Sequence, residues 1–429
     1  MREMKDSGIE WIGQIPKDWT VIKLKHLCKI TDGTHFSPQT TDVGKPYITV
    51  SNVANSRIDI QGALTISEED FETLVKQGCQ PKIGDVLLSK DGTVGRTAVV
   101  VDDNAFVCLS SLGILSPCNH LDSFFLKYML DSVLLQDQMI QAMAGSALRR
   151  ITISKIKDFF ILFPSKFEQI TVANYLDTQC SEIDATAEDI QKEISLLEDY
   201  KKSLIYNVIS NGINHSAYST ETDEVWGNVP QGWKLVDIKY LFEIVKRIAG
   251  KEGYDVLSVT QKGLKVKDIT SGDGQLADNY SGYQFVYPTD YVMNHMDLLT
   301  GWVDCSELFG VTSPDYRVFR LMDKAANNLV YYKYVMQCCY MNKIFYSLGQ
   351  GVSNLGRWRL QTSSFNNFKV PVPPKAEQDE IADFLDTKCS EIDTLIADKK
   401  RQLDIFADYK KSLIYEYVTG KKEVPVKDF

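Results

Sequence analysis

The chain has 429 residues, of which 44% are hydrophobic and 24% charged, and these values are typical of two to four globular domains. The first residues are charged and lack the apolar core of a secretory signal, and no apolar run is long enough to cross a membrane, so we expect a cytoplasmic protein without a membrane partner. The net charge of −10 lies mostly in residues 167–213 and 376–429, which carry −6 and −4, whereas residues 1–166 and 214–375 carry −1 and +1.

Residues 1–166 are predicted to form a lobe of mixed α/β structure. Apolar periodicity predicts a helix over residues 124–143. Apolar runs bounded by turn residues predict strands at 45–50, 84–89 and 97–101.

Residues 167–213 are predicted to form one long helix. Pro164 ends the preceding extended segment, and Gly212 is a suitable C-cap. Apolar residues alternate spacings of four and three, which is the a/d pattern of a coiled-coil seam. The pattern selects the seam residues Leu176, Ile183, Ile190, Ile194, Leu197 and Leu204.

Residues 214–375 are predicted to form a second mixed lobe, with a polar linker at 214–224 and a helix over 331–346. Residues 376–429 are predicted to form a second long helix and a C-terminal tail. Each seam needs an apolar partner, and the nearest partner is the other helix. The second seam consists of Leu385, Ile392, Ile396, Leu403, Phe406 and Leu413.

The two halves of the chain are internal repeats. The segment 199–206 recurs at 408–415, and 180–184 recurs at 389–393, both at an offset of 209. The lobe starts correspond at an offset of 214, which aligns Trp19 with Trp233, and we interpret both as core anchors rather than base-stacking platforms. The interiors of the lobes do not align. This pattern indicates a constant scaffold that carries two different reading lobes.

Sequence signatures of catalysis are absent. No Gly-Lys-Ser/Thr occurs for nucleotide phosphates, and no Asn/Asp-Pro-Pro-aromatic loop occurs for base methylation. Nine scattered cysteines without a Cys-x-x-Cys argue against a zinc site and favour reduced thiols. We therefore expect a chain without catalytic residues, cofactor or metal of its own.

Polar and basic residues in predicted loops are the candidates for DNA contact. For two of these loop segments a purely structural role is the alternative to DNA contact: a tight turn at residues 32–38 and a solvated hairpin tip at residues 90–96. Arg side chains suit phosphate contact and can also fork to a guanine edge. The candidates are Thr34, His35, Lys90, Thr93, Arg96, Ser146, Arg149 and Arg150 in the first lobe, and Lys246, Arg247, Asn354, Arg357 and Arg359 in the second.

Together these features resemble the specificity subunit of type I restriction-modification systems over essentially the whole chain. The order and duplication of the motifs carry the resemblance, since no single motif is specific. The residues concerned are the lobe starts 16–19 and 230–233, the segments 32–35 and 310–316, and the helix entries Glu168-Gln169 with Leu176-Asp177 and Glu377-Gln378 with Leu385-Asp386.

The resemblance implies an α+β fold with two target-recognition lobes, separated by two long antiparallel coiled-coil helices in a pseudo-twofold repeat. It implies recognition of an asymmetric bipartite target in double-stranded DNA and helices that dock two methyltransferase subunits. S-adenosylmethionine would bind those subunits, and ATP and Mg would bind a motor-nuclease subunit. One departure from the pattern is that the second lobe has no Asp-Gly-Thr-His segment, so its readers are expected near Lys246-Arg247 and residues 294–302.

Two other interpretations of the sequence stay open. One is a protein-interaction scaffold whose helices oligomerise and whose lobes have no DNA specificity. The other is a DNA-binding regulator that acts alone. Both predict a function that does not require a methyltransferase partner, so a dependence on such a partner separates them from the first interpretation.

Overall fold

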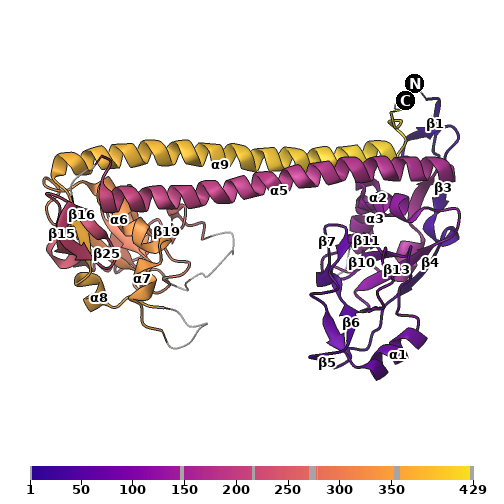
Figure 1. The fold of residues 1–429 in the computed structure, drawn as a ribbon, viewed down its shortest axis with the longest axis horizontal. Helices are drawn as coiled ribbons and strands as arrows, with labels where there is room; N and C mark the ends of the chain where they lie inside the picture. The colour runs from indigo at the N-terminus through magenta and orange to yellow at the C-terminus, as the bar shows by residue number, and fades with distance from the viewer. Residues whose placement is uncertain are drawn as a thin grey trace. The chain divides into compact units, whose positions relative to one another are not determined.

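The structure is a computed structural model that describes residues 2–144, 149–214, 218–269, 277, 279–351 and 358–425. The chain forms two compact units, unit 1 (Met1–Ile190 with Arg401–Phe429) and unit 2 (Gln191–Lys400). Each unit contains one lobe and part of both long helices (Figure 1). The predicted division at residues 166/167, 213/214 and 375/376 stays a prediction, because the compact units divide the chain within the helices.

The two long helices are α5 (Lys166–Asn211), with 46 residues, and α9 (Lys375–Val418), with 44. At about 1.5 Å per residue each is roughly 65 to 70 Å long. Gly212 closes α5 as predicted, and Gly420 closes α9 in the same way, with positive φ and backbone N–H groups that donate to the carbonyls of Val208 and Tyr417. No helix in the described part of the chain has both the length and the apolarity to cross a membrane.

The first lobe is the part of unit 1 that precedes α5. Its elements in chain order are β1 (Met4–Asp6), β2 (Gln14–Pro16), β3 (Thr20–Lys23), η1 (Leu24–His26), β4 (Cys28–Asp32), β5 (Thr40–Thr41), β6 (Lys45–Ile48), η2 (Val50–Asn52), β7 (Val53–Ala54), β8 (Arg57–Ile58), β9 (Leu64–Ile66), α1 (Glu68–Lys76), β10 (Val86–Ser89), β11 (Thr97–Val99), β12 (Val107–Cys108), β13 (Leu112–Pro117), α2 (Ser123–Asp131), α3 (Val133–Met143), α4 (Ile153–Lys157) and β14 (Phe160–Phe163).

The second lobe is the part of unit 2 between α5 and α9. Its elements are β15 (Tyr218–Asp223), β16 (Gly227–Pro230), β17 (Lys234–Asp237), η3 (Ile238–Tyr240), β18 (Phe242–Val245), β19 (Leu257–Thr260), β20 (Gly263–Val266), β21 (Gln284–Val286), β22 (Tyr291–Met293), β23 (Val303–Cys305), β24 (Gly310–Thr312), β25 (Arg317–Leu321), α6 (Leu329–Met341), α7 (Ile344–Ser347), α8 (Thr362–Asn366) and β26 (Lys369–Val372).

Both lobes have the same central sheet although their sequences do not align. The strand order is β11-β10-β13-β4 in the first lobe and β23-β22-β25-β18 in the second, and all neighbours are antiparallel. The flanking pairs also correspond, since β3 pairs with β14 as β17 pairs with β26. The chain therefore has two mixed lobes of one topology, which is the expected α+β fold with an internal repeat.

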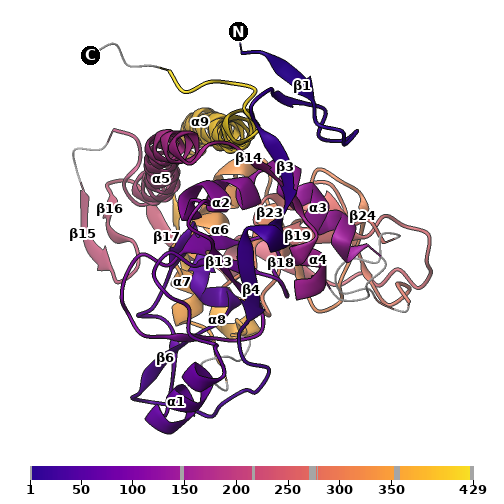
Figure 2. The same cartoon turned by 90° about the vertical axis from the view of Figure 1, so that its right-hand side faces the viewer.

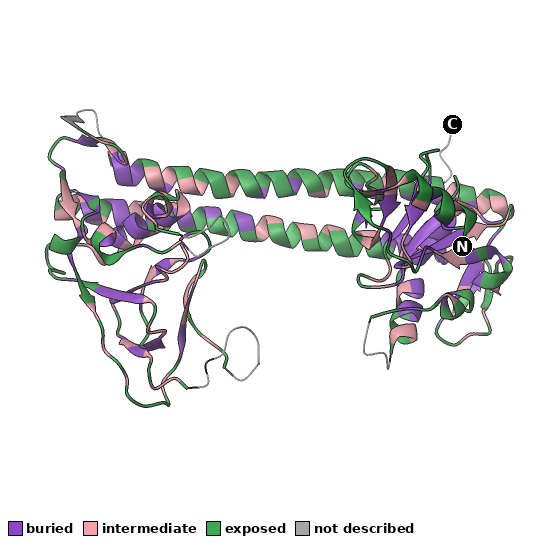
Figure 3. Cartoon of the chain, turned by 90° about the horizontal axis from the view of Figure 1, so that it is seen from below, coloured by how far each residue is buried: buried purple, intermediate pink, exposed green. Residues whose placement is uncertain are grey.

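The lobes differ in how the sheet is extended. In the first lobe a second sheet, β12-β6-β9-β5, lies with α1 at the end farthest from α5 (Figures 1 and 2). In the second lobe the hairpin β19-β20 and the pair β21-β24 are the corresponding additions. Buried residues concentrate in the sheets and beneath the helices, while much of the middle of each long helix is exposed (Figure 3).

Two predicted helices are each interrupted. The helix predicted over 124–143 is α2 followed by α3, because Ser132 has extended backbone (ψ 151°) and its hydroxyl donates to the Met129 carbonyl at 2.6 Å. The helix predicted over 331–346 is α6 followed by α7, with Lys343 in the left-handed region (φ 56°) between them. The three predicted strands of the first lobe are confirmed as β6, β10 and β11.

A buried glutamine at the start of each long helix joins that helix to the lobe before it. Gln169 donates to the Pro164 carbonyl at 3.0 Å and accepts from the backbone N–H of Asp122, the N-cap of α2, at 2.7 Å. Gln378 donates to the Pro373 carbonyl at 2.9 Å and accepts from the backbone N–H of the α6 N-cap at 2.9 Å. These bonds explain the repeated glutamine, because its amide satisfies backbone groups that water cannot reach.

The neighbouring glutamate binds the tryptophan at the lobe start. Trp19 Nε1 donates to Glu168 Oε2 at 2.9 Å, and Trp233 Nε1 donates to Glu377 Oε2 at 2.9 Å. Both tryptophans are buried, so the prediction of core anchors is confirmed. We call the glutamine, glutamate and tryptophan together the entry clasp of each unit.

The long helices run antiparallel, as the ion pairs of unit 2 demonstrate. Glu193 pairs with Lys399, and eight residues later on α5 Lys201 pairs with Asp393 at 2.6 Å, so the partner number falls as the α5 number rises. In unit 1 the repeat-equivalent pair, Lys410 with Asp184, is formed at 2.6 Å. The same lysine of the repeat therefore binds the same aspartate of the opposite helix in both units.

The predicted seam residues all lie on the covered sides of the helices. None of them is among the exposed residues of either helix. The buried ones are Leu176, Ile183, Ile190, Ile194, Leu385, Ile392, Ile396 and Leu413, and the half-buried ones are Leu197, Leu204, Leu403 and Phe406.

Replacing the clasp glutamine should weaken unit 1. Gln169→Ala leaves the buried N–H of Asp122 and two carbonyls without their partner, so we expect the free energy of unfolding to fall by about 1–3 kcal/mol. Chemical denaturation followed by circular dichroism measures this change. Gln191→Ala, an exposed glutamine of the same helix, is the control and should change it by less than about 0.5 kcal/mol. Equal losses in the two variants would contradict the clasp.

Candidate nucleic-acid interface

Three loop segments of the first lobe meet at one end of the central sheet. Asp32 ends β4, Lys90 and Asp91 follow β10, and Arg150 precedes α4. Lys90 Nζ lies 3.5 Å from Asp32 Oδ2 and 3.5 Å from Asp91 Oδ2. Arg150 Nε lies 3.0 Å from Asp91 Oδ1, and these two residues also pair through the backbone. We call these four residues the charge cluster of the first lobe.

The expected display of Lys90 at a hairpin tip is corrected by the structure. Its side chain is 2% exposed, because β10 is an inner strand and the Lys90 backbone bonds to Ser111 on one side and Ile151 on the other. A buried ammonium needs carboxylate partners, which Asp32 and Asp91 supply. Lys90 therefore holds the two carboxylates in place instead of reaching outward.

The segment after β4 is a tight turn fixed against β12. A Cβ on Gly33 would lie 2.0 Å from the Cys108 carbonyl oxygen, so the close approach requires glycine. Thr34 is 3% exposed, and its hydroxyl accepts from the Phe36 N–H at 3.0 Å, so the turn alternative accounts for it. His35 is exposed, with Nε2 3.1 Å from Asp32 Oδ2.

The other first-lobe candidates surround the cluster on exposed turns. Thr93 and Arg96 are exposed in the β10–β11 hairpin, whose turn is held by Ser89 Oγ, a donor to the Thr93 carbonyl at 2.6 Å and an acceptor from the Arg96 N–H at 2.8 Å. Arg149 is exposed beside Arg150. A cleft of about 660 Å³ is lined by Asp32, Lys90 and Arg150 together with the start of α4. Their contact with DNA stays a prediction.

In the second lobe Lys246 and Arg247 directly follow β18. Lys246 is exposed. Arg247 Nη2 lies 2.6 Å from Asp290 Oδ2, and its guanidinium is 4.8 Å from the ring centre of Tyr287. Tyr287 in turn packs 5.2 Å from the ring of Phe309, so the arginine is backed by aromatic side chains.

Two buried basic residues of the second lobe, His295 and Arg317, are not among the individual candidate contacts, although His295 falls in the predicted segment 294–302. His295, two residues after the end of β22, is 8% exposed, and Arg317 at the start of β25 is 4% exposed. Arg317 Nη2 donates to the Leu360 carbonyl at 3.0 Å, and its guanidinium stacks 4.5 Å from Phe365. Nothing near either residue repeats a first-lobe motif, so neither was predicted as an individual contact.

Three predicted contact residues, Ser146, Asn354 and Arg357, lie outside the described residues. Their neighbour Arg359 is exposed and is held through its backbone by Gln350, with N–H to carbonyl distances of 3.0 and 3.2 Å. In the first lobe the exposed Arg150 pairs through its backbone with Asp91 instead. Each lobe therefore has an exposed, backbone-paired arginine just before its short helix, α4 or α8.

The two lobes match the family described as type I restriction modification DNA specificity domain, over residues 16–196 and 230–404. These ranges contain most of each lobe, including both central sheets, and most of both long helices. The chain belongs to this DNA specificity family.

Similar proteins agree with this family along nearly the whole chain. A Methanocaldococcus jannaschii protein described as putative type I restriction enzyme MjaX specificity subunit is 24% identical over 96% of both chains. The MjaVIII specificity subunit of the same organism is 21% identical over 96% of this chain and 94% of the relative. A chain from a solved type I R-M system structure has the same fold, with a TM-score of 0.66, 14% identity, and coverage of 95% of this chain and 99% of that chain.

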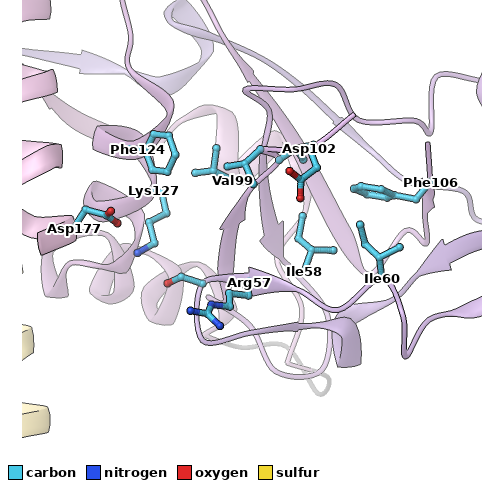
Figure 4. Close-up of a pocket in the computed structure, with 12 residues that line it drawn as sticks. Arg57, Ile58, Ile60, Val99, Asp102, Phe106, Phe124, Lys127 and Asp177 are labelled. Carbon is cyan, nitrogen blue, oxygen red and sulfur yellow. The ribbon is translucent and has the colours of Figure 1, made fainter. Parts of the chain in front are cut away.

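A further hollow of this specificity protein lies in unit 1, where α2 and the strands of the first lobe meet α5 (Figure 4). Its volume is about 330 Å³. Lys127 of α2 and Asp177 of α5 lie on one side of it, and Arg57 of β8 lies below (Figure 4). Its apolar lining residues include Ile58, Ile60, Val99, Phe106 and Phe124.

The second lobe should lose stability as the pH falls. Burial, with the charges of Arg317 and Arg359, lowers the pKa of His295 to about 4, below its unfolded value of about 6.5. The unfolded chain therefore binds the proton first, and stability falls as the pH drops from about 6.5 toward 4. Urea unfolding at pH 7 and pH 5 should show a wild-type loss about 1–2 kcal/mol larger than that of His295→Gln. Parallel losses in the two proteins would contradict this assignment.

Proposed function

We propose that this chain is the DNA-reading subunit of a type I restriction-modification complex, that each lobe reads one half of an asymmetric bipartite duplex target, and that the chain performs no chemistry itself. The observation that supports this proposal is one lobe topology, present twice on equivalent entry clasps, with different charged residues at the matching sheet end. A constant frame with variable ends is what two different DNA half-sites require.

The long helices suit a protein partner, because their segments of the sequence hold most of the negative charge, which DNA repels. We assign to them two methyltransferase subunits, with a motor-nuclease subunit joining through the complex in the cytoplasm. S-adenosylmethionine, ATP and Mg are assigned to those subunits, because the sequence of this chain has none of the nucleotide-binding or methylation motifs.

A repeated pair of exposed apolar side chains supports two copies of the same partner. Leu196 and Tyr200 are 67% and 57% exposed on α5, and at an offset of 209 Ile405 and Tyr409 are 60% and 51% exposed on α9. Residues four apart lie together on one helix face. Exposed apolar pairs of this kind mark a protein contact, and the duplication gives each partner copy an equivalent one.

Charged substitutions at one pair should remove one partner copy. With Leu196→Asp and Tyr200→Asp, we expect the complex with the methyltransferase subunit to change from two partner copies to one, because burying a carboxylate in an apolar contact costs several kcal/mol. Native mass spectrometry of the co-purified complex measures the ratio. The four-residue variant that also has Ile405→Asp and Tyr409→Asp should bind no partner, and Thr186→Asp is the control. Retention of both copies in the four-residue variant would exclude this docking surface.

The length of the helices should set the gap in the DNA target. We propose to insert one heptad after Ile190 and another after Lys400. Seven residues preserve the a/d pattern of the seam. The ion pairs Lys201–Asp393 and Lys410–Asp184 each stay within their own unit. Seven residues add about 10 Å, which is close to the rise of three base pairs. Methylation profiling of a genome that carries this variant and its partner should show the same half-sites about three base pairs farther apart. An unchanged gap would contradict the spacer role, and the absence of any bipartite motif in the wild type would contradict the proposed function.

A further inference from the structure

The strand registers identify which residues of the two lobes occupy the same place. Ile30 pairs with Leu115 as Ile244 pairs with Phe319, and Val86 pairs with Leu115 as Tyr291 pairs with Phe319. Counting residues along each strand from these pairs aligns the corresponding ends of the two central sheets. The matching positions are Asp32 and Lys246, Lys90 and His295, Asp91 and Met296, and Gly113 and Arg317.

A backbone bond extends the match to the loop before the short helix. The Ile151 N–H donates to the Lys90 carbonyl at 2.8 Å, and the Leu360 N–H donates to the His295 carbonyl at 3.0 Å. Arg150 therefore corresponds to Arg359. Both arginines are exposed, and each precedes its short helix, α4 or α8, by the same number of residues.

At these matched positions the first lobe presents carboxylates that are neutralised from within. Lys90 contacts both Asp32 and Asp91 at 3.5 Å, and Arg150 contacts Asp91 at 3.0 Å, so two negative and two positive groups balance. This balance matters because an uncompensated carboxylate would be repelled by phosphate. Asp32 is 27% exposed, and within the described residues no hydrogen bond is made to its Oδ1, which leaves an acceptor at the surface.

The second lobe presents only positive or neutral groups at the same positions. Lys246 takes the place of Asp32, Arg317 takes the place of a glycine, and Met296 takes the place of Asp91. Within the described residues, Lys246, Arg317 and Arg359 form no ion pair with a carboxylate, and the buried His295 Nδ1 has no hydrogen-bond partner. Arg359 lacks the aspartate that occupies the Nε of Arg150, so its guanidinium fork is left available.

Each base pair presents its own pattern of hydrogen-bond donors and acceptors in the major groove. Aspartate accepts from the 4-amino group of cytosine, and arginine donates to O6 and N7 of guanine. We propose that the lobes read with opposite hydrogen-bond polarity: Asp32 accepts from a cytosine amino group in the half-site of the first lobe, and Arg359 donates to a guanine in the half-site of the second. This assignment rests on the proposed function, since it names the base that each lobe reads.

Lys90 is a positioning residue in this scheme. Lys90 contacts Oδ2 of Asp32 at 3.5 Å from the buried side, and the exposed His35 contacts the same oxygen at 3.1 Å, which leaves Oδ1 as the oxygen for a base. His295 and Arg317 have the corresponding role in the second lobe, since the Leu360 backbone that follows Arg359 is bonded to both of them.

The test for the first lobe uses Asp32→Asn, which keeps the size of the side chain and an acceptor oxygen but adds an amino group. The complex of the chain with its methyltransferase partner selects duplexes from a library randomised in both half-sites. We expect one position of one half-site to lose its cytosine preference by about tenfold and to accept adenine, the base that asparagine recognises. Asp103→Asn, an exposed aspartate of the same lobe, is the control and should leave the motif unchanged.

A modified duplex then tests the amino group itself. At the affected position, a pyrimidinone nucleotide without the 4-amino group should weaken binding of the wild-type complex about tenfold and leave binding of the Asp32→Asn complex unchanged. Equal weakening in both complexes, or an A·T pair selected by the wild-type complex at the position that depends on Asp32, would overturn the assignment.

The test for the second lobe uses Arg359→Gln, with Lys262→Gln as the exposed control. We expect a guanine preference to fall about tenfold at one position of the other half-site only. An equal loss of binding to every duplex sequence would indicate a phosphate contact and would overturn the assignment of Arg359. A wild-type complex that selects no motif would instead contradict the proposed function, so the two failures are distinguishable.

Discussion

The buried glutamine at the start of each long helix is the interaction on which the rest of the structure depends. Gln169 and Gln378 are almost fully buried and bind backbone groups on both sides, the proline carbonyl before the helix and the N-cap of α2 or α6. A lobe held in this way cannot rotate on its helix without leaving buried polar groups unsatisfied. Each reading surface therefore has a fixed orientation relative to its own helix.

The same constraint explains why one part of the repeat is conserved and another diverges. The clasps and the lysine–aspartate pairs between the helices are the same residues in both units, because they meet the same structural demand twice. The ends of the central sheets take no part in these clasps or ion pairs, so their side chains are free to differ. Their backbone registers persist while Asp32 is replaced by Lys246 and Gly113 by Arg317, so chemistry at the surface changes without a change of fold.

Much of this frame could be predicted from the sequence, because helices and core anchors leave periodic or repeated signals. The seam, the C-cap glycines and the two tryptophans are of this kind. The interruption at Ser132 was missed, since apolar periodicity continues through it while a single hydroxyl ends the helix. The fold class also follows from the resemblance, and the structure shows which residues form each helix and strand.

The site was less predictable, because burial depends on strand order, which the sequence does not show. Lys90 has the sequence of an exposed hairpin residue, yet it follows an inner strand and is enclosed. Arg317 was missed, and His295 was placed only within the segment 294–302, because the offset between the lobes changes from 214 at their starts to 209 at the helices, so the intervening residues align only through strand register.

The central claim is that an equivalent frame carries two different reading lobes. It is tested most directly by replacing the first lobe, up to the residue before α5, with the second lobe, joined at the equivalent entry clasp. The methylation motif of the resulting complex should become symmetric, with the half-site of the second lobe present twice in opposite orientation. A motif that stays asymmetric, in a complex that assembles normally, would contradict the claim.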